Sequence, residues 1–209
     1  MEFHYDLRIV AATGRACQDY AEVERLADGG LRIGLADGVS GMSGGIEAAT
    51  QAVQSWIQQK SLAPELALAE ADSLLSRAPH GGQTTSIFLE LTADGLRGAS
   101  VGDSRVWWLE ANGTWKELTE HQRPRPYLGS GAAVPIAFSR IPRETGRLLI
   151  CSDGLWRYAG ISQILETVRE QELAAAAELL VAAPQSPISQ DYLDDVSFVL
   201  VGWESSVTD

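Results

Sequence analysis

The sequence predicts an α+β fold, a four-layer α-β-β-α sandwich in which two mainly antiparallel sheets are flanked by helix pairs. Two observations support this fold class. Helical periodicity occurs in two separate pairs of segments, and short apolar or alternating runs separated by turn signals lie around them. Because a sheet and a helix must each bury an apolar face, this order favours two layers of sheet covered by helices.

The first part of the chain contains two expected strands followed by two expected helices. Residues 5–12 and 31–36 are apolar or alternating runs, and each leads into a turn with Gly and Asp. Residues 45–60 and 64–77 place large apolar side chains at helical spacing, and Gly81 then breaks the chain.

A meander of antiparallel strands is expected over residues 83–118, where apolar runs are separated by ADG, GD and ANG turns. Residues 121–145 are rich in Arg, Pro and Gly without a clear period, which predicts an irregular loop. The sequence then predicts a strand ending in a turn, two helices and a final strand, at residues 147–154, 161–170, 171–183 and 196–203.

Composition limits the classes of partner. The 209 residues are 45% hydrophobic and 21% charged, without a repeat or linker, so we expect one domain over residues 1–209. Acidic residues outnumber basic ones by 28 to 16 and no basic patch is present, which argues against a nucleic-acid partner. We expect no membrane partner either, because the most apolar segment, 173–183, is too short to span a bilayer. An N-terminus with Glu2 and Asp6, and two cysteines without a CxxC motif, favour the reducing cytoplasm.

Aspartates recur where the expected strands begin or end, and they are the candidate functional residues: Asp19, Asp37, Asp103, Asp153 and the pair Asp194 and Asp195. Acids at strand ends can converge, and hard divalent cations prefer oxygen ligands and offset the repulsion between carboxylates. Gly38 and Gly154 each follow an Asp, so the backbone can turn sharply there and its carbonyl can reach an ion. A single Asp-Gly also suits an ordinary turn, which is the interpretation of residues 93–95.

The order of the motifs resembles the metal-dependent protein phosphatases, the protein phosphatase 2C family, over nearly the whole chain. Six segments match the family's motifs in order. RACQDY at 15–20 matches the Arg and Asn-Glu/Gln-Asp opening, LADGVSG at 35–41 matches Asp-Gly, and GGQTTSIFLEL at 81–91 matches Gly-Ser/Thr-Thr. VGDSRVWWL at 101–109 matches Gly-Asp-Ser-Arg, ICSDGLW at 150–156 matches Ser-Asp-Gly, and DDVSFVLV at 194–201 matches the closing Asp-Asn motif. The short segment before Ser-Asp-Gly resembles small bacterial members that lack a flap.

The resemblance implies hydrolysis of phosphoserine or phosphothreonine on proteins with two Mn²⁺ or Mg²⁺ ions. Asp37 would bridge both ions and Gly38 would offer its carbonyl to one of them. Asp153 and Asp194 would hold the other ion, and Asp19 would act through water. A hydroxide between the ions would be the nucleophile. The implied partners are a phosphorylated protein and a cognate bacterial-type serine/threonine kinase, which places the chain in signal transduction.

The arginine that binds phosphate is displaced relative to the family. The family places it five residues before the first Asp, where this chain has Gly14, and Arg15 lies one residue nearer. We assign Arg15 to the substrate phosphate, because a guanidinium can pair with two phosphate oxygens and a turn can absorb a one-residue slip. A surface arginine without this role is the alternative.

A third metal site in many relatives uses the residues that match Asp103 and Asp153, together with an acid four residues after the latter. In this chain that last position is Arg157, a cation where a ligand is expected, so a third ion is doubtful. The alternative is that Arg157 points to solvent and leaves the site one ligand short.

Other features leave several alternatives open. No histidine follows the Asp-Gly motif, at residues 39–42, and His4, His80 and His121 are expected to be structural or exposed. Cys17 and Cys151 each precede a candidate site aspartate by two residues. Buried packing is the first interpretation of these cysteines, and a redox switch is the second.

Two further functions compete with phosphatase activity. A pseudophosphatase would bind phosphoprotein or a partner without turnover; Asp37, Asp153 and Asp194 argue against it, whereas Gly14 and Arg157 keep it open. A carboxylate-based phosphohydrolase of small molecules is disfavoured, because the chain lacks the DxDx(T/V) start of the haloacid-dehalogenase type.

Overall fold

The computed structural model describes residues 1–39, 43–79, 81–142 and 145–204, and within them it has two five-stranded antiparallel sheets and five helices. One sheet has the strand order β1 (Glu2–Val10), β10 (Val196–Glu204), β9 (Gly146–Cys151), β6 (Arg105–Glu110) and β7 (Trp115–Glu117). The other has the order β2 (Asp19–Arg25), β3 (Leu31–Asp37), β4 (Ser86–Leu91), β5 (Leu96–Val101) and β8 (Ile136–Arg140).

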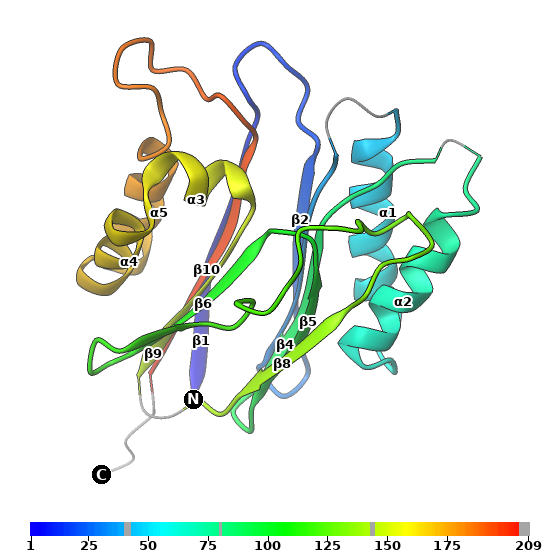
Figure 1. Ribbon diagram of the computed structural model, residues 1–209. Coiled ribbons are helices and arrows are strands. Elements are labelled where there is room, and N and C mark those ends of the chain that lie inside the picture. Colours follow the sequence, from blue (N-terminus) through cyan, green and yellow to red (C-terminus); the bar gives the residue numbers. More distant parts are fainter. Residues whose placement is uncertain (40–42, 80, 143–144, 205–209) are drawn as a thin grey trace.

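The helices cover the outer faces of the two sheets (Figure 1). Helices α1 (Gly45–Gln58) and α2 (Pro64–Leu75) pack on the sheet that contains β3, and α3 (Asp153–Ala159), α4 (Ile161–Glu170) and α5 (Leu173–Ala182) pack on the sheet that contains β10. The predicted α+β sandwich of two antiparallel sheets is therefore confirmed. One side carries three helices rather than the expected pair.

Three apolar layers hold the sandwich together. In β9 the side chains of Leu148 and Ile150 enter the layer between the sheets, whereas Leu149 and Cys151 enter the layer under α3, α4 and α5. This alternation follows from the two-residue period of a strand. Because both faces of the central strands are covered, their sequences are almost continuously apolar, and the sheets form a rigid platform for the residues at their ends.

Three elements differ from the sequence expectation. The strand β2 was not predicted, because its acidic side chains mask the apolar alternation of an edge strand. The edge strand β8 lies inside the expected loop of residues 121–145, because it is short and none of its residues is fully buried. The predicted strand over 147–154 ends at Cys151, and helix α3 begins at Asp153. Asp153 therefore starts a helix rather than ending a strand. An acid in the first turn of a helix interacts favourably with the helix dipole.

None of the helices in the described part of the chain has the length and apolar character that a transmembrane span requires.

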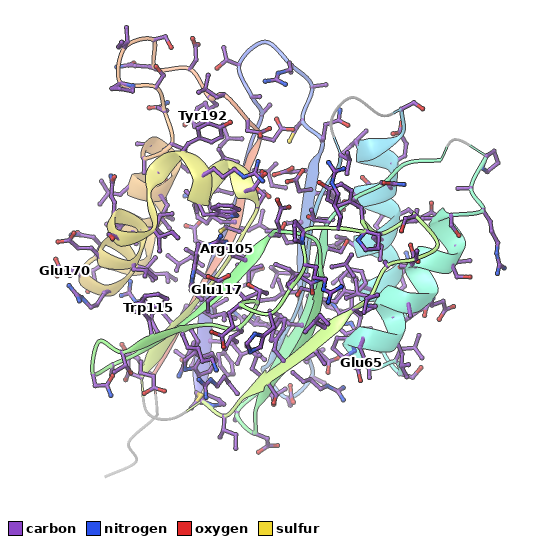
Figure 2. The ribbon with its side chains drawn as sticks, in the orientation of Figure 1. Glu65, Arg105, Trp115, Glu117, Glu170 and Tyr192 are labelled. Atoms are coloured by element: carbon purple, nitrogen blue, oxygen red, sulfur yellow. The ribbon has the colours of Figure 1, made fainter. Side chains whose placement is uncertain are left out.

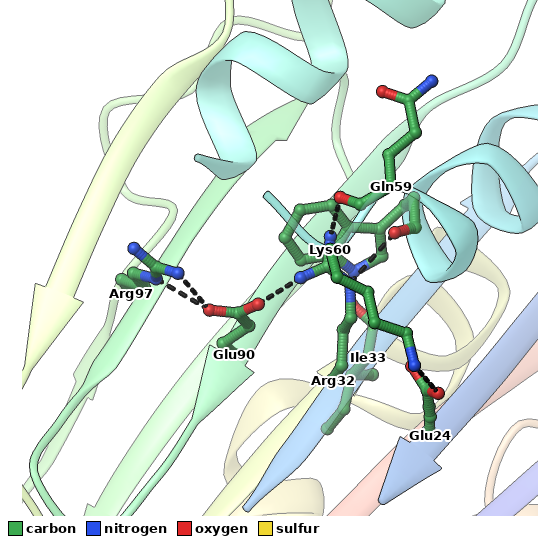
Figure 3. A network of polar contacts seen from close by, with 8 residues as sticks. Glu24, Arg32, Ile33, Gln59, Lys60, Glu90 and Arg97 are labelled. Atoms are coloured by element: carbon green, nitrogen blue, oxygen red, sulfur yellow. Dashed lines mark hydrogen bonds and ion pairs between the residues drawn. The ribbon is translucent and has the colours of Figure 1, made fainter. Parts of the chain in front are cut away.

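A row of charged side chains crosses the outer face of the β2–β3–β4–β5 sheet beneath α1 (Figure 3). Arg32 is fully buried and pairs with Glu90, its direct neighbour on the next strand. Its guanidinium lies 3.3 Å from the centre of the Trp56 ring, and its Nε donates to the Trp56 carbonyl at 2.9 Å. Arg97 donates to the other oxygen of Glu90 at 2.8 Å. The network ties the C-terminal end of α1 to the sheet.

Replacing Glu90 by Leu should destabilise the protein by about 3–5 kcal/mol, because it leaves the guanidinium of Arg32 buried without a counter-charge. Arg97→Leu is the matched control, since it removes the solvent-exposed partner of the same carboxylate and should cost less than about 1 kcal/mol. Urea unfolding of both variants measures the difference. Similar losses of stability in the two variants would show that the buried ion pair contributes no more than the exposed one.

Candidate metal centre

The predicted site aspartates lie at one end of the sandwich, where strands from both sheets begin or end. Asp19 at the start of β2 is the direct cross-strand partner of Asp37 at the end of β3. Asp153 follows β9 and Asp194 precedes β10, and these two strands pair through Cys151 and Phe198. The loops that connect β1 to β2 and α5 to β10 rise above this end of the molecule (Figure 1).

Asp19 is a buried carboxylate that has no hydrogen-bond partner among the described residues. Its residue is 3% exposed, and neither carboxylate oxygen has a hydrogen-bond partner in the part of the chain that the structure describes. Burial raises the pKa of Asp19 to about 7, although Ser197 and Ser152 lie close enough to oppose the shift. Buried polar atoms are normally satisfied, so these two oxygens are unusual and are free to bind a cation.

Asp37 lies among other carboxylates. Burial raises its pKa well above the usual range, and the charges of Asp19, Asp153 and Asp194 raise it further. Like charges held close together destabilise the ionised form of each carboxylate. A divalent cation would stabilise this ionised form. Four of the residues that the sequence predicted therefore lie close enough for their charges to interact.

The backbone of Asp37 is held by the two threonines that precede β4. Its carbonyl accepts hydrogen bonds from the Thr85 amide and the Thr84 hydroxyl, both at 2.8 Å. Its amide donates to the Thr85 hydroxyl at 3.2 Å, and that hydroxyl contacts the Ser104 hydroxyl at 2.7 Å. The Thr-Thr motif thus positions Asp37, a role that the sequence alone did not assign.

Two glycines are required by close backbone contacts. A Cβ on Gly38 would lie 2.5 Å from the carbonyl carbon of Gly45, and one on Gly154 would lie 1.9 Å from the carbonyl oxygen of Asp195. Both distances are far below van der Waals contact, so any side chain would push the backbone apart. The contact at Gly154 places the start of α3 directly against the segment that carries Asp194.

Asp195 is a positioning residue to which the sequence assigned no role of its own. It is buried, and its two carboxylate oxygens accept the backbone N–H groups of Ala12 and Gln18, both at 2.6 Å. These bonds fix the two ends of the β1–β2 loop beside the metal centre. The available signal was the Asp-Asp pair directly before a buried strand.

Asp103 and Asp153 share one guanidinium. Arg157 in α3 donates from Nη2 to Asp103 Oδ2 at 2.7 Å, and its Nη1 lies 3.0 Å from Asp153 Oδ2. Burial and the nearby charges of Asp103 and Asp194 raise the pKa of Asp153, although Arg157 opposes the shift. The guanidinium therefore points to these carboxylates, and the alternative in which Arg157 faces solvent alone does not describe the structure.

Arg15 lies on the rim of the centre. Gly14 has a φ of 77°, and the Arg15 amide donates to the Ala12 carbonyl at 3.1 Å, so a tight turn precedes the side chain. The exposed guanidinium donates to the Leu193 carbonyl at 2.8 Å, one residue before Asp194. The Tyr192 amide joins the same two loops by donating to the Thr13 hydroxyl at 2.9 Å; Tyr192 is labelled at this end in Figure 2.

The histidines and cysteines that the sequence singled out have other environments. His4 and His121 are exposed. Burial raises the pKa of Cys17 to about 11 and that of the buried Cys151 higher still, and both cysteines are free, so these thiols stay protonated and suit packing. Residues 40–42, which follow the Asp-Gly motif, and His80 lie outside the described residues.

The donor set fits hard divalent cations, although it is not a closed cage. Among the residues that the structure describes, no three Asp, Glu, His or Cys side chains converge as a ready-made ligand group. The unpartnered oxygens of Asp19 and the charges that act on Asp37 nevertheless form an oxygen-rich, under-neutralised centre. Mn²⁺ and Mg²⁺ accept such carboxylates together with backbone carbonyls and several waters.

The architecture is that of bacterial serine/threonine phosphatases in solved structures. One match is the phosphatase PstP/Ppp of Mycobacterium tuberculosis, with a TM-score of 0.80, 22% identity, and coverage of 98% of this chain and 100% of that chain. At this level of identity the likeness establishes the fold. No protein-family model matches the sequence, and no curated protein matches it either.

Two further matches were solved with metal ions. The catalytic domain of PstP in complex with 2 manganese ions has a TM-score of 0.76 and 22% identity, covering 95% of this chain and 97% of that one. RsbX in complex with magnesium has a TM-score of 0.77 and 15% identity, covering 96% of this chain and 94% of that one.

The buried carboxylates predict a pH-dependent stability of the metal-free protein. The folded state holds the Asp19 proton up to about pH 7, whereas an unfolded Asp loses it near pH 4. The stability from this preference is full below about pH 4 and is lost as the pH rises towards 7. The loss is at most about 4 kcal/mol.

Urea unfolding in chelator across this range measures the effect against Asp19→Asn, whose side chain does not titrate. Wild type should lose stability relative to the variant as the pH rises, and added Mn²⁺ should restore it. Parallel pH profiles for the two proteins would contradict the assignment of the buried charge.

Proposed function

We propose that this chain is a metal-dependent protein phosphatase that hydrolyses phosphoserine or phosphothreonine, acting as a single catalytic domain over residues 1–209. The observation that carries this proposal is that the charges of Asp19, Asp153 and Asp194 all act on the buried carboxylate of Asp37 at one end of the sandwich. Burying these carboxylates close together would only destabilise a sandwich that bound no ion. In the fold of a bacterial serine/threonine phosphatase, they are suited to bind metal.

Asp37 would bridge two Mn²⁺ or Mg²⁺ ions, with Gly38, Asp153 and Asp194 completing the set and Asp19 acting through water. When bound, such ions lower the pKa of water towards neutrality and screen the charge of a phosphate. The chain supports this centre through its own contacts. Thr84 and Thr85 hold the backbone of Asp37 in place.

Arg15 is proposed to bind the substrate phosphate. It lies on the rim, and its only recorded partner among the described residues is the Leu193 carbonyl, a neutral acceptor that a phosphate dianion can displace. A guanidinium that released this carbonyl would present two parallel N–H donors to the phosphate oxygens.

The substrate is proposed to be a cytoplasmic protein phosphorylated by a cognate serine/threonine kinase. Several fold neighbours are serine/threonine phosphatases, and the exposed position of Arg15 beside two long loops is accessible to a residue in a peptide chain. The acidic chain, with a net charge of -12, is unsuited to nucleic acid.

Asp37→Asn should reduce turnover of a phosphothreonine peptide by orders of magnitude at saturating Mn²⁺, because it removes the charge expected to bridge the ions. Asp94→Asn is the matched control, since Asp94 is exposed and belongs to an Asp-Gly dipeptide in an ordinary hairpin. Steady-state kinetics should show near-normal activity for Asp94→Asn, and circular dichroism should show native folding for both.

Wild-type turnover by Asp37→Asn would refute the assignment of the bridge. Activity that survives thorough chelation would refute the metal-dependent mechanism. Tight binding of phosphopeptide with no turnover under any metal would favour the pseudophosphatase.

Arg15→Ala should lower kcat/KM for a phosphopeptide roughly 10- to 100-fold, the equivalent of one charge-assisted hydrogen bond to the phosphate. The change should fall mainly on KM if Arg15 binds the ground state, and on kcat as well if it binds the transition state more tightly. Arg77→Ala, which removes an exposed arginine elsewhere, is the control. Equal kinetics for the two variants would return Arg15 to the surface-residue alternative.

A further inference from the structure

One guanidinium bridges two carboxylates beside the proposed metal centre. Arg157 Nη2 lies 2.7 Å from Asp103 Oδ2, and Arg157 Nη1 lies 3.0 Å from Asp153 Oδ2. Asp103 belongs to the turn between β5 and β6, and Asp153 lies one helical turn before Arg157 in α3. The contact therefore joins a loop of the meander to the first turn of a helix.

The surrounding contacts fix this bridge in place. The indole N–H of Trp156, the residue before Arg157, donates to the Asp103 carbonyl at 3.2 Å. The guanidinium of Arg105 lies 3.7 Å from the centre of the Trp156 ring, and Arg105 also pairs with Glu117 at 3.4 Å. Figure 2 labels Arg105 and Glu117 between α3 and the meander. Two consecutive residues of α3 thus hold Asp103 by both its backbone and its side chain.

A metal ion between Asp103 and Asp153 would meet three obstacles. Oδ2 of Asp103 already accepts a charge-assisted hydrogen bond from Arg157, and Oδ2 of Asp153 is already in an ion pair with it. The fixed positive charge of Arg157 would repel a divalent cation at short range. Arg157 also occupies the position from which an acidic ligand would complete the site. This cation persists at any working pH, because a guanidinium is not deprotonated in proteins.

We propose that Arg157 is a tethered cation that takes the place of a third divalent ion and makes this chain a two-ion enzyme. The inference rests on the proposed two-ion centre. Arg157 is a positioning residue in it: by holding Oδ2 of Asp153, it fixes the orientation of a carboxylate that is expected to bind one of the core ions. Activity then depends on the two core ions alone and saturates in a single phase as Mn²⁺ is raised.

The test is calorimetric titration of Mn²⁺ into wild type, Arg157→Asp and Arg169→Asp, followed by activity titrations of the same proteins. Arg169→Asp is the matched control, because its side chain is 51% exposed against 47% for Arg157, it also pairs with an acid, and the charge change is identical. Wild type and Arg169→Asp should each bind two ions. Arg157→Asp should bind one additional, weaker ion and show a second activation phase at high Mn²⁺.

Arg157→Ala tests the positioning of Asp153 separately from the replacement of the third ion, because it removes the cation without supplying a ligand. It should keep two tight sites and lose the fixed orientation of Asp153, which is measured as a lower kcat at saturating Mn²⁺ with native circular dichroism. Unchanged kcat in Arg157→Ala would overturn the positioning role. A third site already present in wild type, and unaltered in Arg157→Asp, would overturn the replacement of the ion. Failure of wild type to bind any Mn²⁺ would instead overturn the proposed function itself.

Discussion

Electrostatic repulsion among buried carboxylates is the constraint on which the rest of this structure depends. Burial raises the pKa of Asp19, Asp37 and Asp153 at the same end of the sandwich, and the charge of Asp194 raises the pKa of Asp37 and Asp153 further. A chain free to relax would separate them. Their proximity has to be imposed by the surrounding fold, and the cost has to be met by stabilising contacts elsewhere in the molecule.

The sandwich imposes this proximity through backbone contacts rather than through the acids themselves. Thr84 and Thr85 fix the end of β3, and Asp195 ties the β1–β2 loop to the start of β10. The glycine at 154 lets α3 approach that same segment. Away from the centre, three apolar layers and the buried pair of Arg32 and Glu90 supply the rigidity that holds these strand ends together. The stable and the strained parts of the molecule are therefore spatially separate.

The sequence reveals the acids more readily than the geometry that controls them. Asp37 and Asp153 stand in short Asp-Gly segments next to apolar strands, and this local pattern is visible without a structure. Strands β2 and β8 were missed because both lie at edges of their sheet, where one face meets solvent and apolar periodicity is weak. Asp194 and Asp195 are chemically identical neighbours, so only the tertiary contacts of Asp195 with the β1–β2 loop distinguish a positioning residue from a candidate ligand.

Arg157 shows how a fixed cation can change the way a carboxylate cluster is neutralised. A divalent ion neutralises carboxylates only while it is bound, and its occupancy depends on its free concentration relative to its Kd. A guanidinium carried by α3 is always present at its site, and two donors of its planar fork match Asp103 and Asp153 at once. It brings a single positive charge, less than a metal ion would, and burial together with the charges of Asp103 and Asp194 still raises the pKa of Asp153. The tethered cation thus relieves part of the repulsion permanently, while the remaining charge stays available to attract the ions that the proposed chemistry needs.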